Sequence, residues 1–278
     1  MTTILNLLAV GRDIQWQVFG LVLGIFLALA LIFTVFILII TKVCHIQEDE
    51  KAVKILNLLG GSNCGGCGQS GCAAFAKQLA EGKGDPTACH SCPAENRAEI
   101  AKILGKQIED EGPTVAVVHC AGGDKAANKF EYNGYADCTS RSGLLGGQKL
   151  CPSGCLGGGT CEAHCPSFAI HTKNGVSSVD RDLCTSCGVC MNKCPKHLIG
   201  RIPRSAKVYV ACSNNCRGKE AKDLCEVSCI GCGLCAKNCP EGAITMVNNL
   251  PVIDYKKCVG CKVCVQKCPR HSIKEIED

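Results

Sequence analysis

The chain has 278 residues and a formal net charge of +5, and 27 of its residues are cysteine whereas only 4% are aromatic. This length accommodates two to three small domains, but so few aromatic side chains exclude one large apolar core. Lysine and arginine are scattered instead of clustered, so we expect no nucleic-acid partner. The sequence shows no cleavable secretory signal, and a cysteine-rich chain of this kind more often binds metal than forms disulfides. We therefore expect metal centres to stabilise the fold.

An uncharged, largely apolar segment covers residues 14–41. Its 28 residues exceed the roughly 20 that an α-helix needs to cross a hydrocarbon core, and no small-residue cleavage site follows it. We predict a single transmembrane helix here, within a membrane anchor of residues 1–46. Basic residues are more frequent after the span than before it, so the positive-inside rule places the cysteine-rich part on the cytoplasmic side. No ionisable residue lies between Asp13 and Lys42, which favours an anchor over an ion route.

A small helical domain is predicted over residues 47–112. Helical periodicity is present in three of its segments, residues 48–59, 73–81 and 93–109. Four cysteines accompany these helices, three of them within the run CGGCGQSGC: Cys64, Cys67, Cys72 and Cys89. Three close thiols with one distant partner suit a 4Fe-4S cube, whereas a zinc site more typically pairs two close cysteines with two others. We expect one 4Fe-4S cluster in this domain.

The same run contains a literal match to the dinucleotide-binding pattern, in Gly66, Gly68 and Gly71. No hydrophobic strand precedes the match and Cys67 lies inside it, whereas the true fingerprint follows a strand and opens a helix. No other phosphate-binding glycine loop stands out. We therefore expect this chain to bind neither NAD nor flavin.

After the short strand pattern TVAVVHC, the chain repeats its cysteines at a constant offset of 74 residues. Nine pairs follow this offset: Cys138 and Cys212, Cys151 and Cys225, Cys155 and Cys229, Cys161 and Cys235, Cys165 and Cys239, Cys184 and Cys258, Cys187 and Cys261, Cys190 and Cys264, and Cys194 and Cys268. Such regular repetition indicates a duplicated cofactor-binding module. We assign the first module to residues 113–207 and the second to residues 208–278.

The second module contains the runs CIGCGLCAKNCP and CVGCKVCVQKCP. This is the bacterial two-cluster signature, in which the fourth cysteine of each run binds the other cluster. The predicted ligand sets are Cys229, Cys232, Cys235 and Cys268 for one cluster, and Cys258, Cys261, Cys264 and Cys239 for the other. Between the runs, AITMVNNLPVID predicts two strands around an Asn-Asn turn, and the first module has AIHTKNGVSSVD around Asn-Gly. The fold class predicted for the soluble part is therefore α+β.

The first module departs from the signature, because Gly158 stands where the second module has Cys232. Cys151 precedes Cys155 by four residues and can replace the missing ligand. The sets predicted for this module are Cys151, Cys155, Cys161 and Cys194, and Cys184, Cys187, Cys190 and Cys165. Twenty cysteines thus fill five expected 4Fe-4S clusters, which change oxidation state by one electron and form a path for electrons; no catalytic residue is predicted.

Seven cysteines remain: Cys44, Cys92, Cys120, Cys138, Cys212, Cys216 and Cys225. A sixth cluster on Cys120, Cys138, Cys212 and Cys225, with Cys216 as a substitute ligand, is one hypothesis; buried or paired thiols are the alternative. Cys92 is expected to be a spare thiol that could compete with Cys89. Cys44 stands at the membrane boundary, where either lipidation or an ordinary apolar role is open.

One N-terminal span, a CGGCGQSGC domain and ferredoxin modules in a single chain resemble the B subunits of Rnf complexes. These complexes are membrane-bound ferredoxin:NAD+ oxidoreductases that couple electron transfer to Na+ or H+ translocation. The resemblance implies a bacterial cell membrane, soluble ferredoxin as electron donor, and other Rnf subunits and membrane lipid as partners. The alternatives are a membrane-tethered polyferredoxin of another dehydrogenase or hydrogenase complex and a zinc-binding scaffold.

Overall fold

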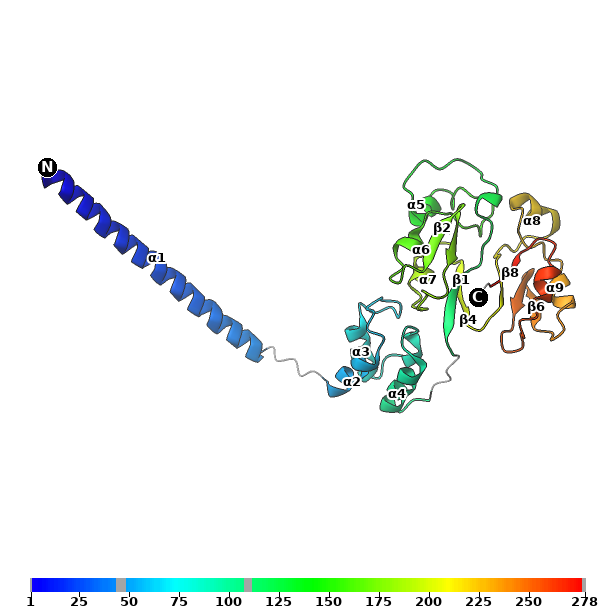
Figure 1. Ribbon diagram of the computed structural model, residues 1–278, viewed down its shortest axis with the longest axis horizontal. Helices are drawn as coiled ribbons and strands as arrows, with labels where there is room; N and C mark the ends of the chain where they lie inside the picture. Colours follow the sequence, from blue (N-terminus) through cyan, green and yellow to red (C-terminus); the bar gives the residue numbers. More distant parts are fainter. Residues whose placement is uncertain (1, 44–48, 108–111, 277–278) are drawn as a thin grey trace. The chain divides into compact units, whose positions relative to one another are not determined.

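The computed structural model describes residues 2–43, 49–107 and 112–276, with side chains of the first helix described from Val18 to Lys42 (Figure 1). The chain divides into two compact units, Met1–Glu48 and Asp49–Asp278. The first contains helix α1 (Thr2–Val43), in which Val18–Lys42 is long and apolar enough to cross a membrane. Its apolar side chains are exposed, Phe26 by 67%, so α1 is not the core helix of a soluble domain.

The second unit begins with a helical domain built from α2 (Glu50–Leu58), α3 (Cys72–Ala80), the 3₁₀ turn η1 (Pro86–Ala88) and α4 (Ala94–Leu104). Ile55, Leu79 and Ile100 form its fully buried centre. The α4 helix ends earlier than the predicted segment, because Gly105 adopts a left-handed conformation that turns the chain out of the helix. Residues 108–109 of that prediction lie outside the described residues.

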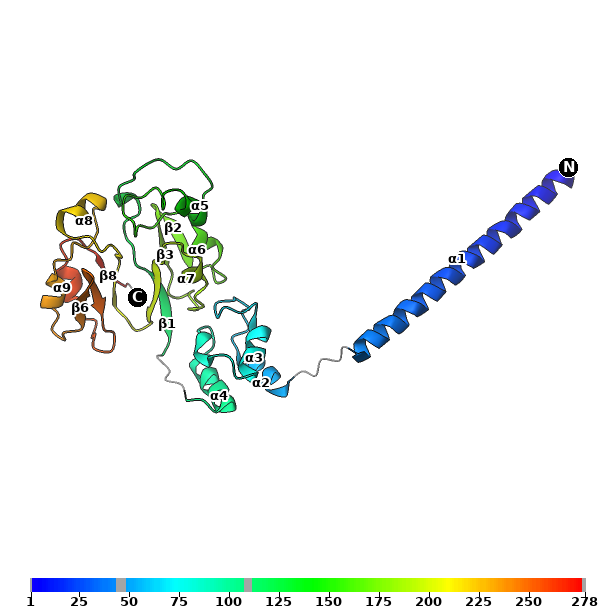
Figure 2. The same cartoon turned by 180° about the vertical axis from the view of Figure 1, so that it is seen from behind.

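The remainder of the unit contains eight described strands: β1 (Thr114–Val118), β2 (Ile170–Lys173), β3 (Val176–Val179), β4 (Ile199–Pro203), β5 (Val208–Val210), β6 (Ile244–Val247), β7 (Leu250–Ile253) and β8 (Ile273–Glu275). They form antiparallel pairs β1–β4, β2–β3, β5–β8 and β6–β7. Each predicted module thus contains one hairpin and one sheet that joins its beginning to its end. Figures 1 and 2 show the two modules side by side from opposite directions.

Short helices carry or flank most of the cysteines: η2 (Gly123–Lys125), α5 (Cys138–Gly143), α6 (Thr160–Ala163), α7 (Val189–Lys193), α8 (Gly218–Leu224), α9 (Leu234–Lys237) and α10 (Val263–Gln266). The two predicted hairpins are confirmed. Asn174–Gly175 and Asn248–Asn249 turn them with positive φ at both central residues, as two-residue hairpin turns require.

The sheet register shows which strands of the two modules correspond. Ile199 pairs with Val118 in the first module, and Ile273 pairs with Val210 in the second. Ile199 and Ile273 are 74 residues apart, whereas Val118 and Val210 are 92 residues apart. From Cys120 to Cys151 the chain runs 31 positions, against 13 from Cys212 to Cys225, so the first module carries an insertion of 18 residues.

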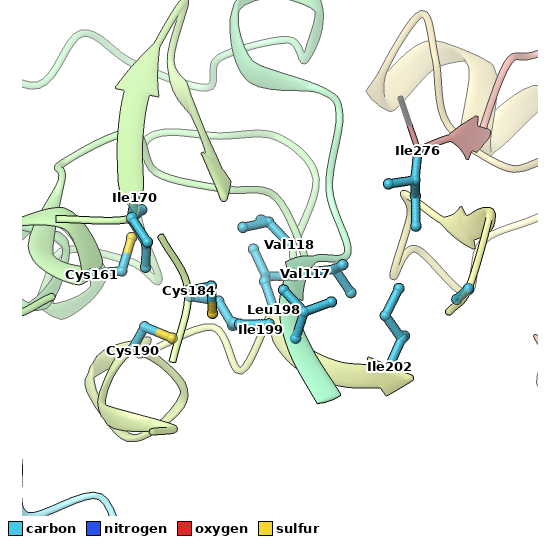
Figure 3. Close-up of a cluster of buried hydrophobic side chains, with 14 residues drawn as sticks. Val117, Val118, Cys161, Ile170, Cys184, Cys190, Leu198, Ile199, Ile202 and Ile276 are labelled. Carbon is cyan, nitrogen blue, oxygen red and sulfur yellow. The ribbon is translucent and has the colours of Figure 1, made fainter. Parts of the chain in front are cut away.

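The modules share buried contacts. Strands β1 and β4 contribute Val118 and Ile199 to an apolar cluster that also contains the first module's Cys161 and, from beyond β8, Ile276 (Figure 3). Tyr209 and Tyr255 of the second module pack against the same cluster. The two modules therefore form one body, and their cysteines are held at fixed places around a common core.

Candidate metal-cluster sites

The second module brings together the first of its predicted sets. One cavity is lined by Cys229, Cys232, Cys235 and Cys268. The loop before α9 passes around it with Gly231 and Gly233 in left-handed conformations, which a side chain would disfavour. Burial raises the pKa of the Cys235 thiol to about 11, and negative charge on its neighbours Cys268 and Cys232 acts in the same direction. Arg270 and Ser272 also line this cavity, and its four sulfur donors suit a thiolate-held cluster.

The second predicted set of this module gathers around α10. Burial raises the pKa of Cys264, and negative charge on Cys258 and Cys261 acts in the same direction. Cys239 packs with Cys258 against the apolar cluster that contains Cys264. Cys261 is exposed, as is Cys232 of the other set. The second module therefore presents both of its candidate sites to solvent.

In the first module, the predicted set of Cys165, Cys184, Cys187 and Cys190 is also brought together. Burial raises the pKa of Cys190 to about 12, with negative charge on Cys187, Cys184 and Cys165 adding to the effect. Backbone N–H groups of Ala169 and Ser186 donate to the sulfurs of Cys165 and Cys184 at 3.3 and 3.4 Å. Such N–H···S bonds stabilise thiolate ligands.

The remaining cavity of the first module differs from the sequence-based assignment. It is lined by Cys138, Cys155, Cys161 and Cys194, and Cys151 is not among its residues. Three of the four correspond by the 74-residue offset to Cys229, Cys235 and Cys268. Cys138 thus occupies the place that Cys232 has in the second module.

The 18-residue insertion explains why Cys138 lies where the second module has Cys232. It returns the chain to Gly158, where an added Cβ would stand 2.7 Å from the backbone nitrogen of Cys138 and 2.7 Å from the carbonyl carbon of Asp137. A cysteine has no room at position 158, and the same close approach brings Cys138 to the cavity. The N–H of Cys138 donates to the hydroxyl of Thr160 at 2.7 Å, which fixes the start of α5 beside the cavity.

Cys151 lies at another cavity, together with Cys120, Cys212 and Cys225. Relative to the sequence-based hypothesis, Cys138 and Cys151 exchange places. The physical reason is that β1 and β5 correspond at an offset of 92, so Cys120 is equivalent to Cys212, and the match of Cys138 with Cys212 has no structural counterpart. Cys216, the suggested substitute ligand, is half-buried and donates to the carboxylate of Glu220 at 3.1 Å, outside this cavity.

The helical domain places Cys67, Cys72 and Cys89 around its apolar core. Burial raises the pKa of Cys89, and negative charge on Cys67 and Cys72 acts in the same direction. Burial also acts to raise the pKa of Cys64, but hydrogen bonds from Gly66, Ser62 and Ser91 outweigh it and lower the pKa. These four cysteines form the predicted set.

Two cysteines that the sequence analysis assigned to no cluster remain, Cys92 and Cys44. Cys92 is buried and donates to the carbonyl of Leu58 at 3.3 Å, and burial raises its pKa to about 11, which marks it as a packing residue. Cys44 lies outside the described residues.

The helical domain meets the first module at Gly66. An added Cβ there would stand 1.9 Å from the carbonyl oxygen of Cys187, so only glycine permits the approach. The pKa of Cys187 is raised mainly by burial, and the charge of Cys64 acts in the same direction. Two candidate sites therefore adjoin across this contact, a role for Gly66 that sequence reasoning missed because the contact joins positions far apart in the chain.

Zinc and iron-sulfur clusters place different demands on cysteine ligands. In the described parts of the chain, no group of three or more His, Cys, Asp or Glu side chains is arranged to hold a single metal ion. A zinc ion requires its sulfurs about 2.3 Å from one centre, whereas a cube holds them at its separate corners. Three described cavities are each lined by four cysteines, a donor set that suits a 4Fe-4S cube.

Charged residues beside the sites differ between the modules. The guanidinium of Arg201 lies against Gly188 and beside Cys184, Cys187 and Cys190; burial lowers its pKa, and the thiolates act to raise it. The equivalent pair in the second module is Lys262 and Glu275, which form a salt bridge. The first module therefore holds a cation next to its cluster site, whereas the second holds an ion pair.

Three family models match parts of the chain. Models of a putative Fe-S cluster, a 4Fe-4S binding domain and a 4Fe-4S dicluster domain match residues 59–91, 178–199 and 228–272, respectively. The chain is 42% identical over 242 residues to the B subunit of the Na(+)-translocating ferredoxin:NAD(+) oxidoreductase complex of Acetobacterium woodii, covering 86% of this chain and 70% of that one.

Two further relatives are similar. The B subunit of the proton-translocating ferredoxin:NAD(+) oxidoreductase complex of Clostridium ljungdahlii is 39% identical over 84% of both chains. The B subunit of the ion-translocating oxidoreductase complex of Methanosarcina acetivorans is 36% identical over 80% of this chain and 85% of that one. The predicted α+β fold class and the family resemblance are confirmed, and the complexes of these relatives agree with a membrane-associated chain. The chain therefore belongs to the family of Rnf complex B subunits, the iron-sulfur electron-transfer subunits of ion-translocating ferredoxin:NAD+ oxidoreductases.

Proposed function

We propose that this subunit accepts electrons from soluble reduced ferredoxin at its second module and passes them through the first module and the helical domain to partner subunits at the membrane. The observation that carries the proposal is the series of four-cysteine sites. It runs from exposed thiols in the second module, past shared buried contacts, to the close approach of Gly66 and Cys187. A 4Fe-4S cluster bound at each site supplies a one-electron couple.

The proposed ligand sets for five clusters combine sequence and structure. They are Cys64, Cys67, Cys72 and Cys89; Cys165, Cys184, Cys187 and Cys190; Cys138, Cys155, Cys161 and Cys194; Cys229, Cys232, Cys235 and Cys268; and Cys239, Cys258, Cys261 and Cys264. The protein's contribution is to hold the thiols, exclude water from the inner sites and donate backbone N–H groups to sulfur.

The exposed end of the series suits an external donor. Val259 stands between Cys258 and Cys261 and is 67% exposed, so an apolar contact is available beside the site. Lys256, Lys257 and Lys267 are exposed around it. This positive charge would steer an acidic partner such as an electron-carrying ferredoxin, mainly by raising the association rate.

The helical domain, at the other end of the series, follows the anchor in the sequence. The excess of basic residues after the apolar segment 14–41 supports a cytoplasmic position for the cluster domains. Because α1 lacks an ionisable residue between Asp13 and Lys42, we assign it to anchoring in lipid, and the movement of Na+ or H+ to partner subunits.

A charge-reversal experiment tests the entry point. In the intact complex, Lys256→Glu with Lys257→Glu is expected to slow reduction by ferredoxin about tenfold at low salt, with a smaller difference at high salt. The matched control is Lys77→Glu with Lys83→Glu in the helical domain, which should leave the rate unchanged. Equal rates for the two double variants in stopped-flow measurements would contradict entry at the second module.

A further inference from the structure

One cavity in the described structure is lined by thiols of both modules. The first module contributes Cys120 and Cys151 to it, and the second contributes Cys212 and Cys225. Cys120 and Cys212 each lie two residues beyond equivalent strands, β1 and β5, whereas Cys151 and Cys225 correspond by the 74-residue offset. The cavity is therefore lined by two equivalent pairs of thiols, with one member of each pair from each copy.

Backbone hydrogen bonds repeat the same equivalence. Cys120 accepts at its sulfur from the N–H groups of Gly122 at 3.5 Å and Cys155 at 3.4 Å. Cys212 accepts from Asn214 at 3.5 Å and Cys229 at 3.3 Å. Hydrogen bonds of this kind favour thiolate over thiol and are typical of cluster ligands. The two copies therefore share the same pair of backbone hydrogen bonds to a cysteine sulfur.

The cavity is fixed by contacts between the modules. Ala126 forms an antiparallel bridge with Cys225, and the N–H of Ala127 donates to the carbonyl of Leu224 at 3.1 Å. Within the second module, the guanidinium of Arg270 donates to the carbonyl of Cys225 at 3.0 Å and fixes the backbone at this cysteine. These bonds hold the thiols of the two modules in register, so their gathering is built into the fold.

The lining of the cavity leaves room for an inorganic group. A Cβ added to Gly122 would stand 3.2 Å from the sulfur of Cys225 and 3.7 Å from that of Cys120, so glycine keeps the space between them open. Asn214, 2% exposed, also lines the cavity, and its side-chain NH2 has no hydrogen-bond partner in the structure. A buried donor of this kind normally has an acceptor, and a cluster sulfide supplies one.

We propose that Cys120, Cys151, Cys212 and Cys225 bind a sixth 4Fe-4S cluster, which joins the two modules. When a preassembled cluster binds, each of the four thiols would release its proton to water, and its thiolate would form one iron–sulfur bond in exchange for a ligand that the cluster carried before, with no change in oxidation state. The N–H groups of Cys155 and Cys229 place this site directly beside a ligand of the neighbouring cluster in each module. The site passes single electrons between the modules, and in this role it rests on the function proposed above.

Iron and acid-labile sulfide counting on the anaerobically purified full chain tests the proposal. We expect about 24 irons per chain, and about 20 for Cys225→Ser, because one cube of four is lost. The matched control is Cys216→Ser, a thiol outside the cavity, which should keep all of the iron. About 20 irons in both the wild-type chain and Cys225→Ser, or one zinc ion in place of the missing iron, would overturn the proposal.

A second variant covers the case in which Cys225→Ser fails to fold. Asn214→Leu keeps all four thiols and removes the buried donor, so we expect the full iron content and a more negative midpoint potential for one cluster in redox-titrated EPR. The titration contains no ferredoxin, so its result tests the sixth cluster whether or not electrons enter at the second module. A wild-type count of about 20 irons with titration curves identical for Asn214→Leu and wild type would overturn the proposal.

Discussion

The two ferredoxin modules share a sheet register and a hairpin but complete one of their sites in different ways. In the second module, Cys232 comes from the same run as Cys229 and Cys235 and is exposed. In the first, the equivalent position is Gly158, and the proposed donor is Cys138, which reaches the cavity from the inserted segment. The thiol within the local run is exposed, whereas the thiol that the insertion brings to the cavity is half-buried. The difference agrees with the proposed entry of electrons at the second module.

Loss of Cys138 is the most severe test of this comparison. We expect Cys138→Ser to lose one cluster of the first module, about four irons, and to reduce electron transfer through the chain by about two orders of magnitude or more. The control is Cys92→Ser, which removes a buried thiol that lines none of the cavities described above. Iron analysis and reduction kinetics measure the effects. A Cys138→Ser chain with full iron content would show that the insertion supplies no ligand.

Gly158 offers the next largest effect. Gly158→Cys introduces the cysteine that the second module has at the equivalent position. Its Cβ, however, would stand 2.7 Å from the backbone at residues 137 and 138. We expect a loss of about 2 kcal/mol or more in unfolding free energy, because backbone must move to accept it. Gly143→Ala in the same insertion meets no atom within 4 Å and should be neutral or slightly stabilising. Thermal unfolding of the two variants checks the difference, and equal stability would contradict the close approach.

The charges beside the clusters sharpen the comparison further. Arg201→Gln removes a cation from the Cys184, Cys187 and Cys190 site, and we expect that cluster's midpoint potential to fall by tens of millivolts, on the order expected for one nearby charge. Lys262→Gln should have a smaller effect, because Glu275 already offsets the charge. EPR-monitored redox titration compares the two. A larger shift for Lys262→Gln would contradict this electrostatic difference between the modules.

The smallest expected effect concerns Ser177, whose hydroxyl lies 3.2 Å from the sulfur of Cys161 and whose equivalent in the second module is Pro251. With the sulfur bound to iron, the hydroxyl would donate to it and raise the potential of that cluster. Ser177→Ala is expected to lower this potential by less than Arg201→Gln lowers that of its own site. The neighbouring Ser178→Ala, exposed on the other face of β3, should cause no change. A shift for Ser178→Ala equal to that for Ser177→Ala would contradict the assignment.

The sequence was informative where ligands follow one another closely. Runs such as CIGCGLCAKNCP set three sulfurs within one loop, and the Asn-Gly and Asn-Asn turns identified both hairpins. The sequence was misleading where a cysteine reaches a cavity from a segment that is distant along the chain. Cys138 matches Cys212 by a constant offset, yet the sheet registers make Cys120 the equivalent of Cys212, because an insertion separates the strand from the cysteine run. Spacing cannot show where an insertion returns to the fold, and the short strands β4 and β8 carry too little periodicity to indicate it.

The iron content of a double variant tests the ligand assignment most directly. Cys151 and Cys225 line one cavity and are assigned to the same cluster, whereas spacing alone assigns them to different clusters. Each single Ser variant should lose about four irons per chain, and Cys151→Ser combined with Cys225→Ser should also lose about four, because the second change removes a ligand from a cluster already absent. A loss of about eight irons in the double variant would contradict the shared site between the modules.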